Sequence, residues 1–157
     1  MKVIICGAGE VGKTLAERLS KENNDVTVID QSQENIREIN ETLDVNTFIG
    51  SGSQPRILET AGAKNTEMLI AVTQSDEVNM IACEVANSQF NIPLKVARVR
   101  DQDYLDPNYQ NLFQKNQISV DLIISPEIEV AEAISCLLYT SDAADDTPCV
   151  DLGGRRI

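Results

Sequence analysis

Residues 2–22, KVIICGAGEVGKTLAERLSKE, join a short apolar run to a glycine-rich turn and then to an amphipathic segment. The apolar run at 3–6 has the length of one buried strand. After the turn, Leu15, Ala16 and Leu19 recur at the spacing of a helix face. The stretch therefore predicts a strand, a tight turn and a helix in that order, which is the context in which a glycine-rich turn binds phosphate.

Each glycine of the turn Gly7-Ala8-Gly9-Glu10-Val11-Gly12 has a predicted part in such a site. Gly7 permits the tight turn, Gly9 lets the backbone approach a pyrophosphate, and Gly12 lets the helix pack closely on the strand. The pyrophosphate would meet free backbone N–H groups at the positive end of the helix dipole. Taken alone, the pattern is equally compatible with an ordinary tight turn.

Asp30 adds a second part of the same site. It ends the apolar run 26–29 and lies 18 residues after Gly12, near the offset at which an acidic side chain binds the ribose hydroxyls of a dinucleotide. A carboxylate there accepts two hydroxyl hydrogen bonds and repels a 2′-phosphate, which favours NAD(H) over NADP(H). The alternative is that Asp30 caps a helix beginning near Ser32.

The rest of the chain alternates strands with helices, which predicts a Rossmann-like α/β fold, a doubly wound parallel six-stranded sheet with helices on both faces. Strands are predicted at residues 2–6, 26–29, 45–49, 68–72, 94–99 and 120–124. Helices are predicted at residues 13–22, 36–43 and 55–62, from the segment 73–77 to residue 90, around 109–115, and from residue 126 onward.

In a sheet of this type the strand order 3-2-1-4-5-6 places the ligand crevice between the carboxyl ends of the first and fourth strands. The turn at 7–12 and the loop at 72–76 are expected to meet there. Thr73 and Gln74 are therefore predicted to contact the nicotinamide half of the ligand. Capping of the following helix is a second role for these side chains, compatible with the first.

Composition limits the functions open to the chain. Its 157 residues have the length of one domain. Thirteen lysines and arginines against 25 acidic residues give a net charge of −12, which argues against binding to nucleic acid. No apolar run is long enough to span a bilayer and the N terminus has no signal-peptide pattern, so we expect a cytoplasmic protein that does not insert into the membrane.

The chain contains no histidine, and its four cysteines, at 6, 83, 136 and 149, lack the spacing of a metal site. These features argue against zinc ligation and against histidine-based acid–base catalysis. Cys6 and Cys83 lie in apolar strand and helix patterns, which predicts buried thiols without a chemical role. We assign no catalytic or metal-binding residue.

Residues 1–134 resemble the N-terminal nucleotide-binding domain of the TrkA type, also called RCK or KTN, found in peripheral regulatory subunits of bacterial Trk potassium-uptake systems. The resemblance rests on several motifs in order, namely Gly7–Gly12, Asp30, GSGSQPR (50–56), AGA (61–63), LIAVTQSDEVNM (69–80), ARVR (97–100) and ISPE (124–127). Such a set at family spacing is far more specific than one glycine turn.

The resemblance implies that NAD(H) is held by residues 7–11, Asp30, Thr73 and Gln74, with Arg98 as a further contact. Arg98 leaves the fifth predicted strand near the crevice, where a guanidinium could pair with a phosphate. Arg100 is a weaker candidate of the same kind. The alternative for each arginine is a surface ion pair in an acidic protein.

The family also implies a regulatory mechanism without catalysis. Such domains assemble as dimers or larger rings on the cytoplasmic side of a potassium transporter, and nucleotide binding shifts their relative orientation and gates potassium flux. Related domains bind ATP or ADP, and some place a divalent cation at a glutamate matching Glu127. One carboxylate is a poor cation site, and the simpler interpretation of Glu127 is an acid in the first turn of a helix after Pro126.

We expect the nucleotide-binding domain to occupy residues 1–135 and the remaining residues to lie outside it. Residues 139–157 lose the helical pattern and contain little apolar material. The segment CLLYTSDAADD (136–146) resembles the translation of an adapter used in making sequencing libraries. Residues 136–157 are therefore expected to be a non-native tail, in which a truncated gene reads into adapter sequence.

Two enzyme classes also place a glycine turn after the first strand. A small NAD-dependent oxidoreductase needs a proton donor and a substrate pocket, and Tyr104, Tyr109 and Lys115 do not form a convincing acid–base set. A methyltransferase that uses S-adenosylmethionine also has an acid after the second strand. The motifs between residues 50 and 100 favour the regulatory family over both.

Overall fold

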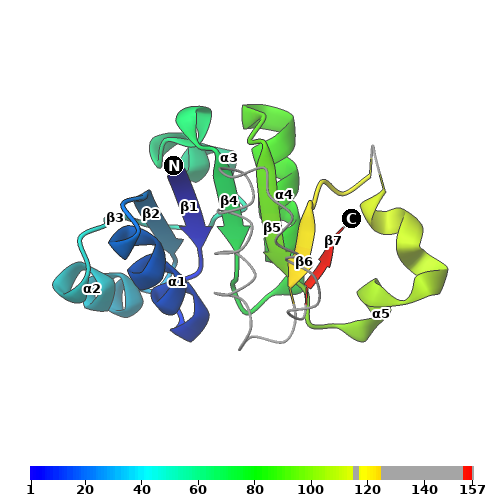
Figure 1. Cartoon of the computed structure of the whole chain (residues 1–157), viewed down its shortest axis with the longest axis horizontal. Coiled ribbons are helices and arrows are strands. Elements are labelled where there is room, and N and C mark those ends of the chain that lie inside the picture. The colour runs from blue at the N-terminus through cyan, green and yellow to red at the C-terminus, as the bar shows by residue number, and fades with distance from the viewer. Residues whose placement is uncertain (115–116, 125–153, 157) are drawn as a thin grey trace.

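The computed structural model describes residues 1–114, 117–124 and 154–156, which form one sheet flanked by helices (Figure 1). The strands are β1 (Lys2–Cys6), β2 (Asp25–Asp30), β3 (Asn46–Ile49), β4 (Met68–Ala71), β5 (Leu94–Arg98), β6 (Leu122–Ile124) and β7 (Gly154–Arg156). The helices are α1 (Glu10–Lys21), α2 (Gln33–Thr42), α3 (Pro55–Thr60), α4 (Asp76–Phe90) and α5 (Gln102–Leu105), with the 3₁₀ helices η1 (Ala63–Asn65) and η2 (Pro107–Phe113).

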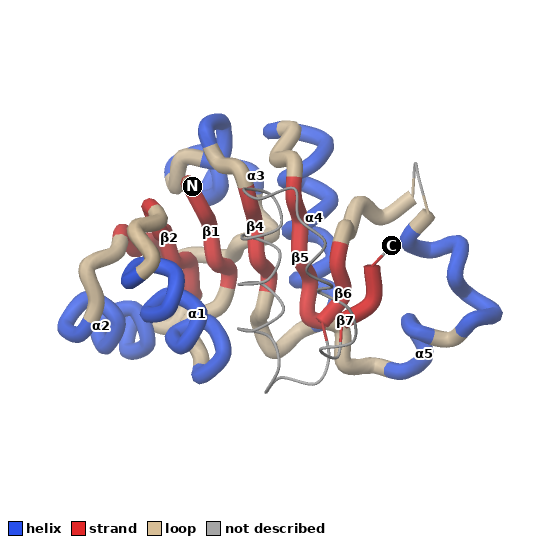
Figure 2. The backbone as a smooth tube through the Cα atoms, viewed as in Figure 1, coloured by secondary structure: helices blue, strands red, loops and turns tan. Residues whose placement is uncertain are grey.

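The strand order is β3-β2-β1-β4-β5-β6-β7, and Figure 2 shows β2, β1, β4, β5, β6 and β7 in succession. Strands β1 to β6 pair parallel with one another. This confirms the predicted parallel sheet and its order 3-2-1-4-5-6. From β1 the chain adds β2 and β3 toward one edge of the sheet, and from β4 it adds β5 and β6 toward the other edge. The carboxyl ends of β1 and β4 are therefore the point where the order reverses and a crevice forms.

Successive residues of β1 face two separate hydrophobic cores. Val3 and Ile5 pack in one core with Leu15 of α1 and with the apolar face of α2. Ile4 and Cys6 point to the opposite core, which contains residues of α3 and α4. Because helices cover both faces of the sheet, the central strand is apolar at every position from 3 to 6.

β7 extends the sheet beyond the predicted six strands. It pairs antiparallel with β6 through the backbone of residues 154–156. The segment Gly-Arg-Arg has no apolar alternation, so its sequence carries no strand signal. The edge of a parallel sheet nevertheless presents unpaired N–H and C=O groups, which pair with an extended segment whatever its side chains. Backbone pairing thus reaches into the segment expected to be a non-native tail.

The helix predicted around 109–115 is the 3₁₀ helix η2 at 107–113, and the short helix α5 precedes it. Pro107 lacks an N–H group, and Asp106 before it is extended, with φ −63° and ψ 131°, so one helix does not run through both. The side chains of Asp101 and Asp106 cap the two short elements. The helix predicted from residue 126, with Glu127, lies outside the described residues.

We expect the thiols of Cys6 and Cys83 to be inert in the folded chain. Both residues are fully buried, and burial raises the pKa of Cys6 to about 12 and the pKa of Cys83 well above its ordinary value. Because the thiolate is the reactive form, iodoacetamide at about pH 8 should leave both unmodified, whereas both should react in guanidinium chloride. Peptide mass spectrometry measures this, and native labelling at the unfolded rate would contradict it.

Candidate functional site

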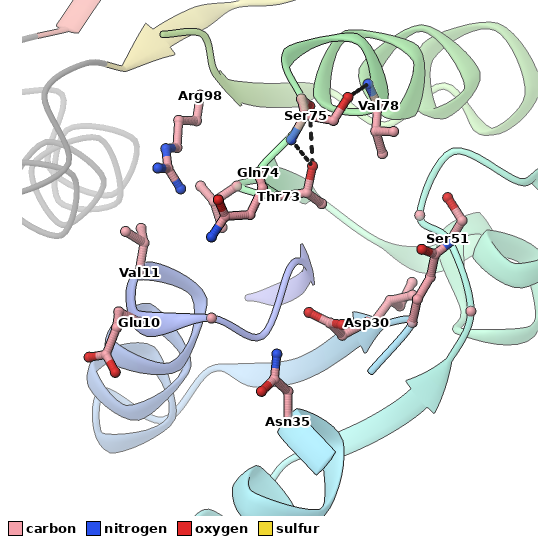
Figure 3. Close-up of a pocket in the computed structure, with 16 residues that line it drawn as sticks. Glu10, Val11, Asp30, Asn35, Ser51, Thr73, Gln74, Ser75, Val78 and Arg98 are labelled. Atoms are coloured by element: carbon pink, nitrogen blue, oxygen red, sulfur yellow. Dashed lines mark hydrogen bonds between the residues drawn. The ribbon is translucent and has the colours of Figure 1, made fainter. Parts of the chain in front are cut away.

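A cleft of about 430 Å³ opens at the carboxyl ends of the central strands (Figure 3). Its walls come from the turn after β1, the segments after β2 and β3, the loop after β4 and the end of β5. This is the crevice position expected from the strand order. The residues singled out from the sequence that line it are Gly9, Glu10, Val11, Asp30, Thr73, Gln74 and Arg98.

Gly7, Ala8 and Gly12, the other residues singled out from the sequence, form the base of the turn behind this lining. Gly7 has a φ of +117°, and a Cβ there would lie 2.8 Å from the carbonyl oxygen of Val72. A Cβ on Gly12 would lie 1.8 Å from the carbonyl oxygen of Gly7. These distances agree with the expected tight turn and with the close packing of α1 on β1.

The N terminus of α1 opens onto the cleft. Gly9 is the N-cap residue, no side chain among the described residues caps this helix, and Lys13 N donates to Gly9 O at 2.9 Å. The N–H groups of Glu10 and Val11 come before this first hydrogen bond of the helix, so they have no partner within it, and they lie at the positive end of the helix dipole. Figure 3 shows the Glu10 carboxylate turned away from Asp30 and Arg98. The helix end is therefore suited to an anion such as a phosphate.

Asp30, the last residue of β2, ties the glycine turn to the neighbouring strand. Its Oδ2 accepts a hydrogen bond from Ala8 N at 2.6 Å, and its Oδ1 accepts one from Ser32 N at 2.7 Å. Ser32, not Asp30, caps α2, since Ser32 Oγ accepts from Asn35 N at 3.2 Å. An ionised carboxylate has about four acceptor sites, so each oxygen retains capacity for a ligand hydroxyl.

The loop after β4 is shaped by Thr73 and the buried Asn79 of α4. Thr73 donates to Asn79 Oδ1 from its N at 2.8 Å and from its Oγ1 at 2.7 Å. Ser75 N donates to Thr73 Oγ1 at 3.2 Å, and Ser75 itself caps α4 by accepting from Val78 N (Figure 3). The capping role considered for Thr73 and Gln74 therefore belongs to Ser75.

Arg98 and Arg100 differ in position although they are two residues apart. Arg98 is 5% exposed, and its guanidinium lies in the wall of the cleft opposite Asp30 (Figure 3). Arg100 is exposed, and its Nη2 donates to the carbonyl oxygen of Gln74 at 3.2 Å while its N donates to Asp76 Oδ1 at 3.0 Å. Arg98 is thus the arginine placed to meet a ligand, and Arg100 supports the loop that holds Gln74.

Several residues of the site were not singled out from the sequence. Asn35 and Ser51 lie on the Asp30 side of the cleft (Figure 3). Ser51 belongs to the second turn of small residues at 50–53, which was a usable signal for a backbone that approaches a ligand. The signal for Asn79 was a polar residue at a position of α4 that the helical spacing assigns to the buried face.

The described residues contain no group of three or more His, Cys, Asp or Glu side chains arranged to hold a metal ion. Glu127, the residue considered for a cation, lies outside them. In the same part of the chain, every helix is too short or too polar to cross a bilayer.

The sheet order, the glycine turn before α1 and the acidic end of β2 define a doubly wound α/β domain of the Rossmann type. Residues 3–126 match the TrkA-N domain. The chain belongs to the TrkA-N domain family, as the motifs between residues 7 and 127 predicted.

Two of the similar proteins are each named Trk system potassium uptake protein TrkA. The protein from Azorhizobium caulinodans is 48% identical over 145 residues, and the one from Halomonas elongata is 49% identical over 138 residues. The matches cover 92% and 88% of this chain but 32% and 30% of those proteins. The chain therefore spans about a third of the length of these relatives.

Solved structures share the fold at lower identity. The TrkA-N domain of inner membrane protein ybaL from Escherichia coli has a TM-score of 0.66 at 22% identity, covering 87% of this chain and 96% of that chain. The GsuK channel bound to NAD has a TM-score of 0.60 at 20% identity, and the match covers 74% of this chain and 20% of the channel chain. Kef CTD of Shewanella denitrificans in an AMP-bound form has a TM-score of 0.62 at 22% identity, covering 92% and 84%.

Proposed function

We propose that this chain is the NAD(H)-binding regulatory domain of a Trk-type potassium-uptake system. The observation that carries the proposal is one cleft in which Asp30, the N terminus of α1 and Arg98 face a common space (Figure 3). A carboxylate for ribose hydroxyls, amides for a pyrophosphate and a guanidinium for a second phosphate match the polar parts of a dinucleotide. The name of the relatives supports potassium uptake as the process.

In this proposal the adenosine half of NAD(H) lies on the Asp30 side of the cleft, where Asn35 and Ser51 also line the wall. The pyrophosphate crosses the amides of residues 9–11. The nicotinamide half extends toward Thr73, Gln74 and Arg98. Gly7, Ala8 and Gly12 act through the shape of the turn.

The domain would act as a regulator without catalysing a reaction. Residues 1–135 would form the nucleotide-binding domain, and residues 136–157 would add only backbone pairing at the sheet edge. The domain would assemble as a homodimer or larger ring at the cytoplasmic face of a membrane-embedded potassium transporter. Nucleotide binding would then favour one arrangement of the ring over another, because a ligand shifts such an equilibrium only by its difference in affinity.

Calorimetric titration of the whole chain with NADH, NAD⁺, NADPH, ATP, ADP and S-adenosylmethionine tests the proposed ligand. We expect NADH to bind at least about tenfold more tightly than NADPH, because the carboxylate of Asp30 repels a 2′-phosphate. We also expect NADH to bind more tightly than ATP or ADP, since only the dinucleotide reaches both Asp30 and the opposite wall with a second ribose. Light scattering on the same samples gives the number of subunits.

A preference for ATP or ADP would instead place this domain among nucleotide-gated regulators of the same family. Binding of S-adenosylmethionine in place of NADH would indicate a methyltransferase. Oxidation of NADH in the presence of a panel of carbonyl substrates would indicate an oxidoreductase. Absence of binding by every nucleotide would contradict the proposed site.

A further inference from the structure

α4 begins with two polar side chains, Asp76 and Asn79, that lie about one turn apart and face the loops after β4 and β5. Asp76 is 9% exposed, and Asn79 is completely buried. Asp76 accepts hydrogen bonds from Arg100 N at 3.0 Å and Asp101 N at 2.8 Å, so within the described part of the chain its side chain bonds only to the segment after β5. Asn79 holds both loops.

The side chain of Asn79 forms four hydrogen bonds. Its Oδ1 accepts from Thr73 N and Thr73 Oγ1, at 2.8 and 2.7 Å. Its Nδ2 donates to Thr73 O at 3.2 Å and to Arg98 O at 2.8 Å. The amide thus uses two acceptor and two donor sites, its full hydrogen-bonding capacity. One buried group fixes the backbone of Thr73 relative to the backbone of Arg98.

Thr73 and Arg98 are two of the residues that line the cleft on the side away from Asp30. The Asp30 side is held by separate bonds, from Ala8 N and Ser32 N to the Asp30 carboxylate. The side-chain hydrogen bonds that hold the two sides of the cleft are therefore separate, although the backbone just after β4 is joined to β1 next to the turn by the bond from Val72 N to Cys6 O at 2.8 Å. Loss of the Asn79 amide should alter the position of Thr73 and Arg98 while leaving Asp30 and the glycine turn in place.

We propose that Asn79 is a positioning residue for the second half of a bound dinucleotide. The assignment rests on the proposed nucleotide-binding function and adds a residue that the ligand does not touch. A ligand that spans the cleft, such as NADH, depends on Asn79. A ligand confined to the Asp30 side, such as AMP, does not.

The test is calorimetric titration of the whole chain and its variants with NADH and with AMP up to millimolar concentrations. Asn79→Ala is expected to weaken NADH binding by about tenfold or more and to change AMP affinity by less than about twofold. Asp76→Ala is the comparison variant, because it removes a buried side chain from the same turn of α4 and releases the backbone of Arg100 without releasing Thr73, so NADH affinity should fall less than in Asn79→Ala. Thermal unfolding establishes that each variant is folded.

Asn79→Asp provides a second substitution of nearly unchanged size. It keeps an acceptor for Thr73 but replaces the two N–H donors by an oxygen that faces the carbonyl groups of Thr73 and Arg98, so the same selective loss of NADH affinity is expected. If neither variant folds, amide hydrogen exchange of the unsubstituted chain with NADH or AMP bound tests the assignment instead. NADH should then protect residues 73–79 and 98–101 more strongly than AMP does.

Three results would overturn the assignment. NADH affinity could be unchanged in a folded Asn79→Ala chain, NADH and AMP affinities could fall equally, or NADH and AMP could protect residues 73–79 and 98–101 to the same extent. Failure of the proposed function itself is distinct from these, because the unsubstituted chain would then fail to bind NADH, whatever its affinity for AMP.

Discussion

Asp30→Ala is expected to weaken NADH binding by about 10- to 100-fold, which corresponds to about 1.5–3 kcal/mol for a hydrogen bond to a charged group. The substitution removes the acceptor proposed for the ribose hydroxyls. It also removes the carboxylate oxygen that lies 2.6 Å from Ala8 N, so the glycine turn loses a link to β2. Calorimetric titration of the whole chain with NADH measures the loss.

Asp25 offers a matched control for this substitution, because it is an exposed aspartate at the opposite end of the same strand. Asp25→Ala should leave NADH affinity unchanged. Asp30→Asn, which keeps one acceptor oxygen and removes the charge, should lose less affinity for NADH and discriminate less against NADPH. If Asp30→Ala is folded and binds NADH as the unsubstituted chain does, Asp30 is not part of the site.

Among the substitutions proposed here, Gly12→Ala is expected to lower the free energy of unfolding most. The new Cβ would lie 1.8 Å from the carbonyl oxygen of Gly7 and 2.7 Å from its carbonyl carbon. Both atoms belong to the backbone and cannot rotate away, so α1 must move off β1 and lose part of its packing. We expect the free energy of unfolding to fall by about 3 kcal/mol or more, measured by urea denaturation.

Gly9→Ala is the counterpart in the same turn and should affect binding instead of stability. Apart from Gly9 and its two chain neighbours, no heavy atom of the described residues lies within 4 Å of the Cβ position, and the φ of −77° is accessible to alanine. The free energy of unfolding should change by less than about 1 kcal/mol. NADH affinity should fall by about tenfold or more, because the methyl group occupies the proposed path of the pyrophosphate.

The predictions for Gly9→Ala and Gly12→Ala can be contradicted separately. Unchanged NADH affinity in the Gly9→Ala chain would show that the ligand does not cross the turn at that residue. A Gly12→Ala chain as stable as the Gly9→Ala chain would contradict the steric argument for the packing of α1 on β1.

The strand order and the turn at 7–12 could be predicted because their signals are local. A buried strand, a turn and a helix face are each recognised within about ten residues, and alternation of such units leaves few possible topologies. Asp30 follows from its position at the end of the second apolar run. The hydrogen bond from Ala8 N to Asp30 Oδ2 joins residues 22 apart, and the sequence alone does not show it.

The remaining features depend on contacts between distant segments or on a competing local rule. Asn79 reaches the carbonyl oxygen of Arg98, 19 residues away, and only the packing of α4 against β5 brings them together. β7 depends on the free edge of β6, because its own residues carry no strand pattern. A helix was predicted around residues 109–115, whereas the structure has a 3₁₀ helix that begins at Pro107 and a separate short helix, α5, before it.

The two amide hydrogen bonds to Asp30 have a consequence for the energetics of regulation. They fix the carboxylate to the backbone at 2.6 and 2.7 Å, so this side chain would have little rotational entropy left to lose on binding the ribose proposed above. A preorganised acceptor leaves more of the interaction free energy as net affinity. In a multidomain assembly, that free energy would remain available to stabilise one domain arrangement relative to another.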